Sequence, residues 1–378
     1  MSTVQATNLK HGSSASNNIV LDASGNATFA GTAAMGSSFL RNRIINGDMR
    51  IDQRNAGASV TMSAAITYTV DRWFSFEDTD GVMTAQQITS APSGFSNAIR
   101  CTTTTADASL GAAQRVIFGQ RIEGFNVADL GWGTASAQTV TLSFWVRSSL
   151  TGTFGGSLNN VATRSYPFTY TISAANTWEQ KTVTIPGDTS GTWNSTSSSG
   201  IQVAFGLGVG STFSGTAGAW AASDLNSATG AVSVIGTLNA TWDLTGVQLE
   251  VGTVATPFER RQFGQELALC QRYYQKTYEQ NTVPGTATRL GLVMAFASSG
   301  AANYGGGFNF RQTMRAAPSV SYWDGAGNAS RVSYYATAWN DNNNWLTLLN
   351  TSSDSVVTTA SVQVTASVFI QYTASAEL

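Results

Sequence analysis

The chain has 378 residues, of which 42% are hydrophobic and 11% are charged, and this composition supports buried cores in two folded domains. Its 20 lysine and arginine residues are spread along the sequence and the formal net charge is −2, which excludes the basic stripe of a nucleic-acid-binding protein. No run of about 18 apolar residues occurs and the first residues lack the apolar core of a signal peptide, so we expect folding in the cytoplasm without membrane insertion.

Residues 1–40 are rich in Ser, Ala, Asn and Gly and carry few aromatic side chains, so they cannot bury a core by themselves. Ile19 and Leu21 share one parity before a turn at residues 24–26, and Phe29 follows that turn, which predicts one small hairpin. Two interpretations stay open, a segment that becomes ordered by packing against other chains and a disordered leader.

Residues 41–261 consist of short alternating runs separated by turn residues. Every second side chain is apolar over residues 140–146, 166–172 and 201–209, and residues 178–185 give a further alternating stretch. The natural architecture for such runs is a jelly-roll sandwich of two antiparallel sheets packed face to face. Because Trp73, Trp145 and Trp178 lie inside alternating apolar patterns, we expect these three side chains in the core.

The end of this first sandwich is marked by a change from a strand pattern to a helical pattern. The parity of the apolar side chains slips at Gly246, between Leu244 and Val247, which predicts a β-bulge at that glycine. After Pro257 the apolar residues recur at steps of three or four, which predicts an amphipathic connecting helix over residues 262–280.

Residues 281–378 return to the strand pattern after a linker at residues 281–287. Strand-like runs occur at five places, beginning at Met294, Gly306, Ser319, Arg331 and Val362. They are enough for a second, smaller sandwich. The expected fold class is therefore all-β, with a jelly-roll β-sandwich at residues 41–261, a short helix, and a second β-sandwich at residues 281–378.

Five segments carry a resemblance to a known family. They are NGDMRIDQRN at residues 46–55, VDRWF at 70–74, NTWEQKTVTIPGDTSGTW at 176–193, LTGVQLEVGTVATPFERR at 244–261 and ELALCQRYY at 266–274. The chain resembles a family of tailed-phage virion proteins, described as tail-fibre or receptor-binding proteins with a sandwich like a carbohydrate-binding module. The resemblance implies a homotrimer, and it implies that residues 1–40 attach to other virion proteins.

Histidine-based catalysis is not expected, because the one histidine, His11, lies in the N-terminal segment and not in a rigid site. Glycoside hydrolysis needs two carboxylates instead. Three pairs are candidates: Asp48 with Asp52, Asp78 with Asp80, and Asp243 with Glu250. We interpret each as solvated loop carboxylates and assign no catalytic residue, so polysaccharide degradation stays an alternative.

A structural metal is not expected either. In the modules that the sandwich resembles, an acidic pair often precedes the closing strand and helps to hold calcium, whereas Thr245 and Gly246 precede Val247 in this chain. The two cysteines are too far apart in sequence for a metal motif. We predict no metal and no cofactor, and Asp48 and Asp243 are the acidic residues to inspect.

Carbohydrate binding is the remaining chemistry, because aromatic rings stack on the apolar faces of sugars while polar side chains bond the hydroxyls. Three tryptophans stand among small polar residues in predicted loops: Trp132, Trp193 and Trp220. The sequence AWNDNNNW predicts a recognition loop with the candidate residues Trp339, Asp341, Asn342, Asn344 and Trp345. Packing over a sandwich end or in a subunit interface is the alternative for each of them.

The expected function is that of a structural, non-enzymatic virion component, a tail-fibre or receptor-binding subunit that attaches to host surface glycan. The virion and the receptor are implied by the family resemblance, and glycan contact is the chemistry that the loop tryptophans favour. A head-fibre or capsid-decorating protein of the same build is one alternative. A polysaccharide-degrading tailspike is the other.

Overall fold

A computed structural model describes residues 7–10, 12–13, 19–21, 23, 27–29, 41–299, 304–343, 346–360 and 365–378. The chain divides into two compact units, Met1–Arg41 and Asn42–Leu378. Over the described ranges a single short α-helix accompanies many strands, and no helix has the length and apolar character needed to cross a membrane.

The first unit contains three short antiparallel strands, β1 (Asn8–Leu9), β2 (Ile19–Leu21) and β3 (Ala27–Phe29). β2 pairs with β3 so that Ile19 lies opposite Phe29, and the hairpin predicted from the alternation is confirmed. Val20 and Leu21 of β2 are each 39% exposed, so this strand leaves apolar side chains in contact with solvent.

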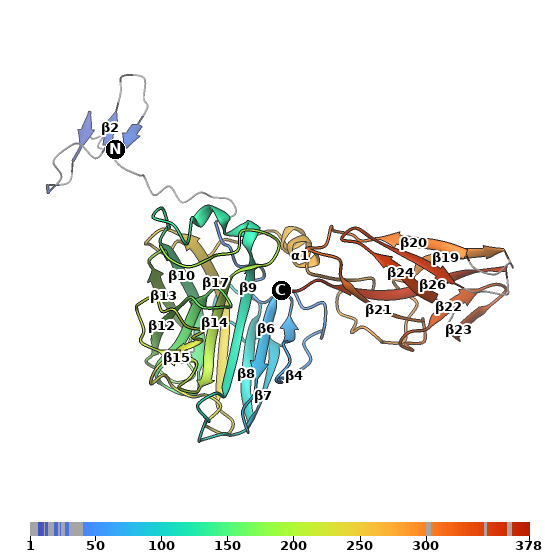
Figure 1. The fold of residues 1–378 in the computed structure, drawn as a ribbon, viewed down its shortest axis with the longest axis horizontal. Coiled ribbons are helices and arrows are strands. Elements are labelled where there is room, and N and C mark those ends of the chain that lie inside the picture. The colour runs from blue at the N-terminus through green and yellow to red at the C-terminus, as the bar shows by residue number, and fades with distance from the viewer. Residues whose placement is uncertain are drawn as a thin grey trace, which may run out of the picture. The chain divides into compact units, whose positions relative to one another are not determined.

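Two six-stranded antiparallel sheets form a β-sandwich in the second unit (Figure 1). In spatial order, the first sheet consists of β13 (Glu179–Ile185), β10 (Val140–Ser148), β17 (Thr241–Val251), β8 (Ala98–Thr105), β7 (Val82–Ile88) and β4 (Val60–Thr61). The second sheet consists of β12 (Ser165–Ile172), β11 (Gly152–Asn159), β14 (Ser199–Val209), β9 (Arg115–Glu123), β6 (Trp73–Glu77) and β5 (Thr67–Val70). The all-β sandwich expected from the alternating runs is confirmed.

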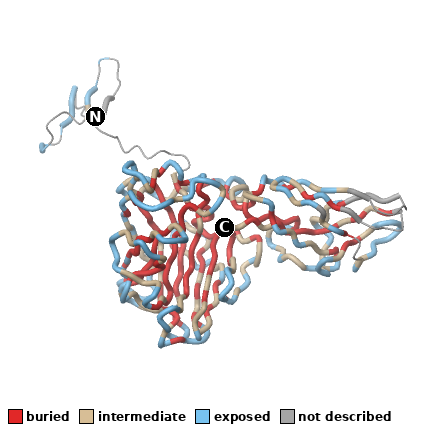
Figure 2. The backbone as a smooth tube through the Cα atoms, viewed as in Figure 1, coloured by how far each residue is buried: buried red, intermediate tan, exposed pale blue. Residues whose placement is uncertain are grey.

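Apolar side chains from the facing sides of the two sheets form one core. Figure 2 shows the buried residues concentrated along the strands of the sandwich. Phe144 of β10 meets Phe205 of β14 with 5.0 Å between ring centroids, and Trp242 of β17 meets Phe118 of β9 at 6.2 Å. Because successive side chains of a strand point to opposite faces, each alternating run directs its apolar set inward. Burial of this apolar surface is the main force that holds the sheets together.

The three tryptophans expected in the core have different environments. Trp73 is fully buried and stacks on Phe118, as predicted. Trp145 and Trp178 are half-buried, so the prediction was wrong for both. Trp145 has the opposite parity to the core residue Phe144, and Trp178 lies against the guanidinium of Arg147 at 4.7 Å. Alternation shows which side chains share a face of a strand, but it does not show which face is buried. A large apolar residue on the outer face therefore looks like a core residue in the sequence.

β17 contains the bulge predicted at Gly246. Its pairing with β10 shifts register between Ser143 and Trp145, and the φ angle of Gly246 is +60°. A Cβ atom at this position would lie 2.7 Å from the ring of Phe95 and 3.0 Å from Trp145. Glycine therefore meets two demands here, a left-handed backbone and close packing of aromatic rings.

The connecting helix is shorter than predicted. Helix α1 spans Phe263–Gln271, and the expected continuation to residue 280 is wrong, because β18 (Tyr274–Lys276) pairs with β26 (Thr365–Ser375) instead. The aromatic side chains at Tyr274 and Tyr278 continue the helical spacing in sequence. The main-chain bonds to a strand about a hundred residues later override that local pattern.

β26 is the central strand of the C-terminal β domain, residues 274–378. It pairs with β18 and with three further strands, β19 (Val293–Ser299), β21 (Ser319–Trp323) and β22 (Val332–Tyr335). β22 also pairs with β23 (Trp339–Asn343). A separate three-stranded sheet contains β20 (Tyr304–Asn309), β25 (Ser355–Ala360) and β24 (Leu346–Thr351).

The strands predicted in this domain are confirmed where the structure describes them. Val368, Ile370 and Tyr372 of β26 are buried, as their shared parity requires. They pack with Val332 of β22 and Val356 of β25 in a core of their own. Val362 and Val364, to which the same pattern assigned the same face, lie outside the described residues.

Candidate functional site

Three of the predicted loop tryptophans converge in space at the edge of the sandwich core. Trp132 meets Trp193 with 4.7 Å between ring centroids and Trp220 at 5.3 Å, and Trp193 and Trp220 are 5.5 Å apart, each pair edge to face. Trp132 is 8% exposed, and the other two are half-buried against the core. The indole N–H groups donate to main-chain carbonyls of Gln138, Ser190 and Pro186. Most of this cluster therefore serves packing.

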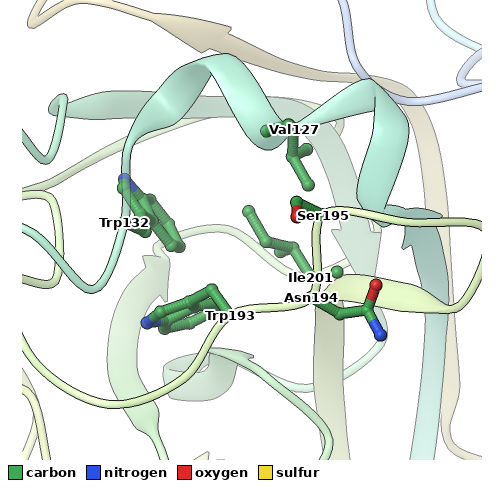
Figure 3. A pocket seen from close by; sticks show the side chains of 8 residues that line it. Val127, Trp132, Trp193, Asn194, Ser195 and Ile201 are labelled. Carbon is green, nitrogen blue, oxygen red and sulfur yellow. The ribbon is translucent and has the colours of Figure 1, made fainter.

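A small hollow lies beside the rings of Trp132 and Trp193 (Figure 3), and we call it the tryptophan pocket. It spans about 290 Å³, including space open to solvent. It is lined by Val127, Ala128, Trp132, Trp193, Asn194, Ser195, Gly200 and Ile201. Two 3₁₀ turns, Gly124–Asn126 and Ala128–Leu130, form one wall. The Asn194 side-chain oxygen already accepts two bonds from Thr196, at 2.7 and 2.8 Å, which leaves few polar groups for a ligand.

A larger cleft lies on the outer face of the second sheet, and we call it the sheet-face cleft. It spans about 470 Å³, including space open to solvent, and is lined by Ile66, Phe74, Phe76, Arg115, Ile117, Arg121, Val161, Gln202, Asp224 and Asn226. Phe74 and Phe76 of β6 have the opposite parity to the core residue Trp73, and Arg115 and Arg121 of β9 have the opposite parity to Phe118. The alternation that builds the core thus also places this set on the outside.

Arg115 is held firmly in the sheet-face cleft. Its Nη1 donates to the side-chain oxygen of Asn226 at 2.6 Å and to Asp224 at 3.3 Å, and its guanidinium lies 3.8 Å from the centroid of the Phe213 ring. The Asp224 side chain is 40% exposed, so its carboxylate can still accept bonds from a ligand. A fixed cation, an exposed carboxylate and a buried amide thus lie side by side.

Arg121 lies at another part of the same cleft. Its Nε donates to the side-chain oxygen of Gln202 at 3.0 Å, its Nη1 donates to the carbonyl of Leu378 at 2.9 Å, and the guanidinium lies 5.2 Å from the Phe74 ring. Burial lowers the pKa of Arg121, because desolvation disfavours the charged form. The guanidinium remains charged because its ordinary pKa is so high.

The sheet-face cleft was not predicted from the sequence. A signal was present, since WFSFE at residues 73–77 and RVIFGQR at residues 115–121 carry large side chains on both parities. A strand that is apolar or aromatic on both faces is expected to be covered on both faces. Asp224 and Asn226 could not have been assigned to this cleft from the sequence, because no local sequence pattern relates them to Arg115.

The predicted recognition loop is an edge strand. Trp339 to Asn343 form β23, which pairs with β22, so the prediction of a loop was wrong. The register places Trp339 opposite Tyr335. Pairing with β22 gives the main-chain N–H and C=O groups of this segment hydrogen-bond partners, whereas in a loop they would bond to water. Asn344 and Trp345, the last two candidates, lie outside the described residues.

Trp339 itself is 39% exposed on the outer face of this hairpin. Its ring meets Tyr335 at 5.3 Å and Phe369 at 5.2 Å, both edge-on or tilted, and Arg289 lies 5.2 Å from its centroid. Tyr335 is 46% exposed, and Phe369 is half-buried. Exposed aromatic rings therefore gather at this place.

The acidic and amide candidates next to Trp339 have structural partners. Asp341 accepts a 2.5 Å bond from the hydroxyl of Ser333 and pairs with Arg289 at 2.5 Å. Asn342 donates its main-chain N–H to the buried carboxylate of Asp324 at 2.6 Å, and its φ angle is +68°. Asp341 therefore holds the hairpin in place, whereas the exposed Asn342 side chain is free to contact solvent.

The two acidic residues singled out for a metal are paired with arginines. Asp48 lies 3.1 Å from Arg50, and Asp243 binds Arg100 at 2.8 Å and Arg147 at 2.7 Å. These pairs neutralise the carboxylates that a cation would need. In the ranges that the structure describes, no group of three or more His, Cys, Asp or Glu side chains could hold a metal ion.

No protein-family model and no curated protein matches this chain. Among solved structures, it is similar to the enzymatically active domain of tailspike protein 4 of bacteriophage CBA120, at 12% identity and a TM-score of 0.30, over 56% of this chain and 22% of that chain. It is also similar to a putative sugar binding protein from Bacteroides thetaiotaomicron, at 11% identity and a TM-score of 0.34, over 56% of this chain and 100% of that chain. A family 11 carbohydrate-binding module from Clostridium thermocellum, in complex with a mixed-linked tetrasaccharide, has 11% identity and a TM-score of 0.27, over 50% of this chain and 96% of that chain.

Proposed function

We propose that this chain is a non-catalytic structural subunit of a bacteriophage virion that binds host surface glycan in the sheet-face cleft. The observation that carries the glycan part is the composition of that cleft. Phe74 and Phe76 supply an apolar floor, while Arg115, Asp224 and Gln202 supply donors and acceptors around it. Sugars require both, because a pyranose ring has apolar faces and a rim of hydroxyl groups.

The roles of the polar residues follow from their bonds. Arg115 is preorganised by Asn226, so a ligand does not have to order a flexible side chain. Asp224 accepts hydroxyl bonds in its exposed part, while its charge is paired with that of Arg115. The tryptophan pocket offers less, because it is smaller and its indole N–H groups are already paired.

A second glycan contact is proposed at Trp339 in the C-terminal β domain. Its exposed ring, together with the exposed ring of Tyr335 opposite it in register, forms a platform on which a sugar can stack. The rings of this platform are exposed, so it is expected to bind more weakly than the sheet-face cleft. Two weak sites on one subunit strengthen attachment when both are engaged.

The absence of catalysis is part of the proposal. Glycoside hydrolysis uses two carboxylates about 5 to 9.5 Å apart. Among the described residues that line the sheet-face cleft, Asp224 is the one carboxylate. Incubation with bacterial surface polysaccharides should therefore release no reducing ends. Release of sugar fragments, and its loss in Asp224→Asn, would favour the polysaccharide-degrading tailspike instead.

The virion location is supported by the family resemblance of the sequence segments. It implies a tail fibre or receptor-binding subunit, a homotrimer, and attachment through residues 1–40, with a head-fibre or capsid-decorating protein as the alternative. Immunogold labelling of intact particles with antibodies to the C-terminal β domain separates the two positions. Light scattering of the purified chain reports the oligomer, and a monomer at micromolar concentration contradicts the trimer.

Glycan binding is tested with an array of bacterial surface glycans and two cleft variants. Phe76→Ala removes part of the floor, and Asp224→Asn removes an acceptor charge while keeping the shape. The matched controls are Phe125→Ala, at a phenylalanine 61% exposed outside the cleft, and Asp80→Asn, at an exposed acid of the same sandwich. We expect both cleft variants to lose at least about tenfold in affinity. Equal binding by cleft and control variants rejects the cleft as the site.

A further inference from the structure

Residues 376–378 continue from β26 of the C-terminal β domain onto the sandwich. The carboxylate of Glu377 accepts hydrogen bonds from Arg72 and from Arg54, the latter at 2.7 Å. The side chains of Arg72 and Glu377 are only 1% and 6% exposed. When one partner of such a shielded pair is removed, the other remains as an uncompensated buried charge, which is strongly unfavourable.

Arg315, in the loop between β20 and β21, binds two of these three residues. Its Nε donates to the carbonyl of Ala376 at 2.7 Å and its Nη2 to the carbonyl of Glu377 at 3.0 Å. Its Nη1 donates to the carbonyl of Ser197 in the sandwich at 2.8 Å. One planar guanidinium with several fixed donors therefore binds both domains.

Aromatic rings from the segment after α1 complete this contact. The guanidinium of Arg72 lies 3.5 Å from the centroid of the Tyr273 ring, and that of Arg54 lies 3.7 Å from the Tyr274 ring. Cations on aromatic faces gain most where water is excluded, as it is here. Both arginines belong to the sandwich, so the contact again joins it to the chain that enters the C-terminal β domain.

Arg121 connects this contact to the sheet-face cleft. Its Nη1 is bonded to the Leu378 carbonyl and its Nε to Gln202, and both Arg121 and Gln202 line the cleft. In the described part of the chain, the third nitrogen, Nη2, has no hydrogen-bond partner. The bonds to Leu378 and Gln202 fix the plane of the guanidinium and so decide where Nη2 lies.

We infer that residues 376–378 act as a latch that fixes the C-terminal β domain to the sandwich and positions Arg121 for a ligand in the sheet-face cleft. The second part rests on the proposed function. An arginine that is already oriented binds a hydroxyl without the entropy loss of ordering a free side chain. Because coupling between sites is reciprocal, a glycan bound to Arg121 stabilises the latched state.

The latch is tested without a ligand by hydrogen exchange of the full chain. Glu377→Gln keeps the size of the side chain and removes the charge opposite Arg72. Residues 274–276 of β18 pair with residues 373–375 of β26. We expect exchange of residues 274–276 and 373–376 to accelerate at least about tenfold. Asp354→Asn, at an exposed acid of the same domain, is the control and should exchange as the wild type does.

A milder variant keeps this test decisive if Glu377→Gln does not fold. Arg54→Gln removes the partner of Glu377 that is 14% exposed and leaves the Arg72 pair in place. A smaller acceleration in the same segments is expected. Exchange that is unchanged in every folded latch variant overturns the latch.

The link to the cleft is tested by glycan-array binding of the same variants. Glu377 does not line the cleft, so a direct contact with the ligand cannot explain a change in affinity. We expect Glu377→Gln to weaken binding about fivefold, and the wild type with bound glycan to exchange more slowly at residues 373–376. Faster exchange with unchanged affinity overturns the positioning of Arg121. If the wild type binds no glycan on the array, the proposed function fails, and the exchange measurement alone decides the latch.

Discussion

The indole N–H of Trp242 donates a 3.0 Å hydrogen bond to the hydroxyl of Tyr170 in the middle of the sandwich core. Trp242 belongs to β17 of the first sheet and Tyr170 to β12 of the second, so this bond joins the two sheets. Both side chains are almost fully buried, and burial raises the pKa of Tyr170 far above its ordinary value. A polar bond inside an apolar core restricts how the two sheets can slide past one another.

Tyr170→Phe should destabilise the sandwich by about 1 to 3 kcal/mol, because the buried indole N–H of Trp242 loses its acceptor. The ring itself remains, so the loss of packing is small. Urea unfolding followed by tryptophan fluorescence measures the change. Tyr335→Phe, at a tyrosine 46% exposed in the other domain, is the control. Equal midpoints for both variants would show that the inter-sheet bond adds nothing.

Gly246→Ala should destabilise the sandwich more than an alanine at another glycine with positive φ. At Gly246 the new Cβ meets the ring of Phe95 at 2.7 Å in addition to the backbone strain at φ +60°. Gly230 has φ +79° with nothing within 4 Å of a Cβ, so Gly230→Ala isolates the backbone strain. We expect about 1 kcal/mol for Gly230→Ala and about 1 to 3 kcal/mol more for Gly246→Ala. Similar losses in thermal unfolding would mean that Phe95 moves aside easily.

Asp71 should make the stability depend on pH in an unusual direction. Burial raises its pKa to about 7, against the opposing effects of Arg54 at 3.6 Å and of a bond from Gln53, while Glu377 and Asp52 raise it further. The folded chain therefore holds this proton more tightly than the unfolded chain. Its contribution to stability is fully present below the ordinary value of 3.8 and is lost as the pH rises through about 7.

Asp71→Asn tests this expectation, because the amide cannot ionise and keeps the shape of the side chain. The free energy of unfolding of the wild type should fall relative to that of Asp71→Asn between about pH 4 and pH 7. Urea titrations at several pH values across this window measure the difference. Asp80→Asn, at an exposed carboxylate, should run parallel to the wild type. Parallel curves for Asp71→Asn as well would place the Asp71 pKa near its ordinary value.

Trp339→Ala should weaken adsorption to host cells by a smaller factor than Phe76→Ala. Trp339 offers a 39% exposed ring, whereas Phe76 lines the sheet-face cleft. We expect a loss of about three- to tenfold for Trp339→Ala, and roughly additive free energies in the double variant. Leu290→Ala, at a residue 67% exposed in the same domain, is the control. Unchanged adsorption by Trp339→Ala removes the C-terminal platform from the proposed function.

Several features followed from local sequence patterns because they depend on neighbouring residues alone. The slip of parity at Gly246 predicted the bulge, and the shared parity of Val368, Ile370 and Tyr372 predicted their burial. The helix after Pro257 was predicted at its start, and its end at Gln271 was not. That end depends on the pairing of β18 with β26, which has no local signal.

The candidate site residues were also predicted only in part from local sequence. Trp132 and Trp193 were identified as loop aromatics by their small polar neighbours, yet their burial against each other is a contact between distant segments. The AWNDNNNW segment has a polar composition typical of loops, and pairing with β22 made it a strand. Composition reports which groups are present, and hydrogen bonding to a neighbour decides the conformation of a polar segment.

Alternation with a period of two was enough to establish an all-β chain with a sandwich, since it arises from the geometry of a single strand. The sheet-face cleft and the latch required the folded chain. Arg115 meets Asp224 across 109 residues of sequence, and Arg121 meets Leu378 across 257. Such contacts depend on strand order and register, which result from the summed burial of two whole sheets, and no local pattern of residues carries that information.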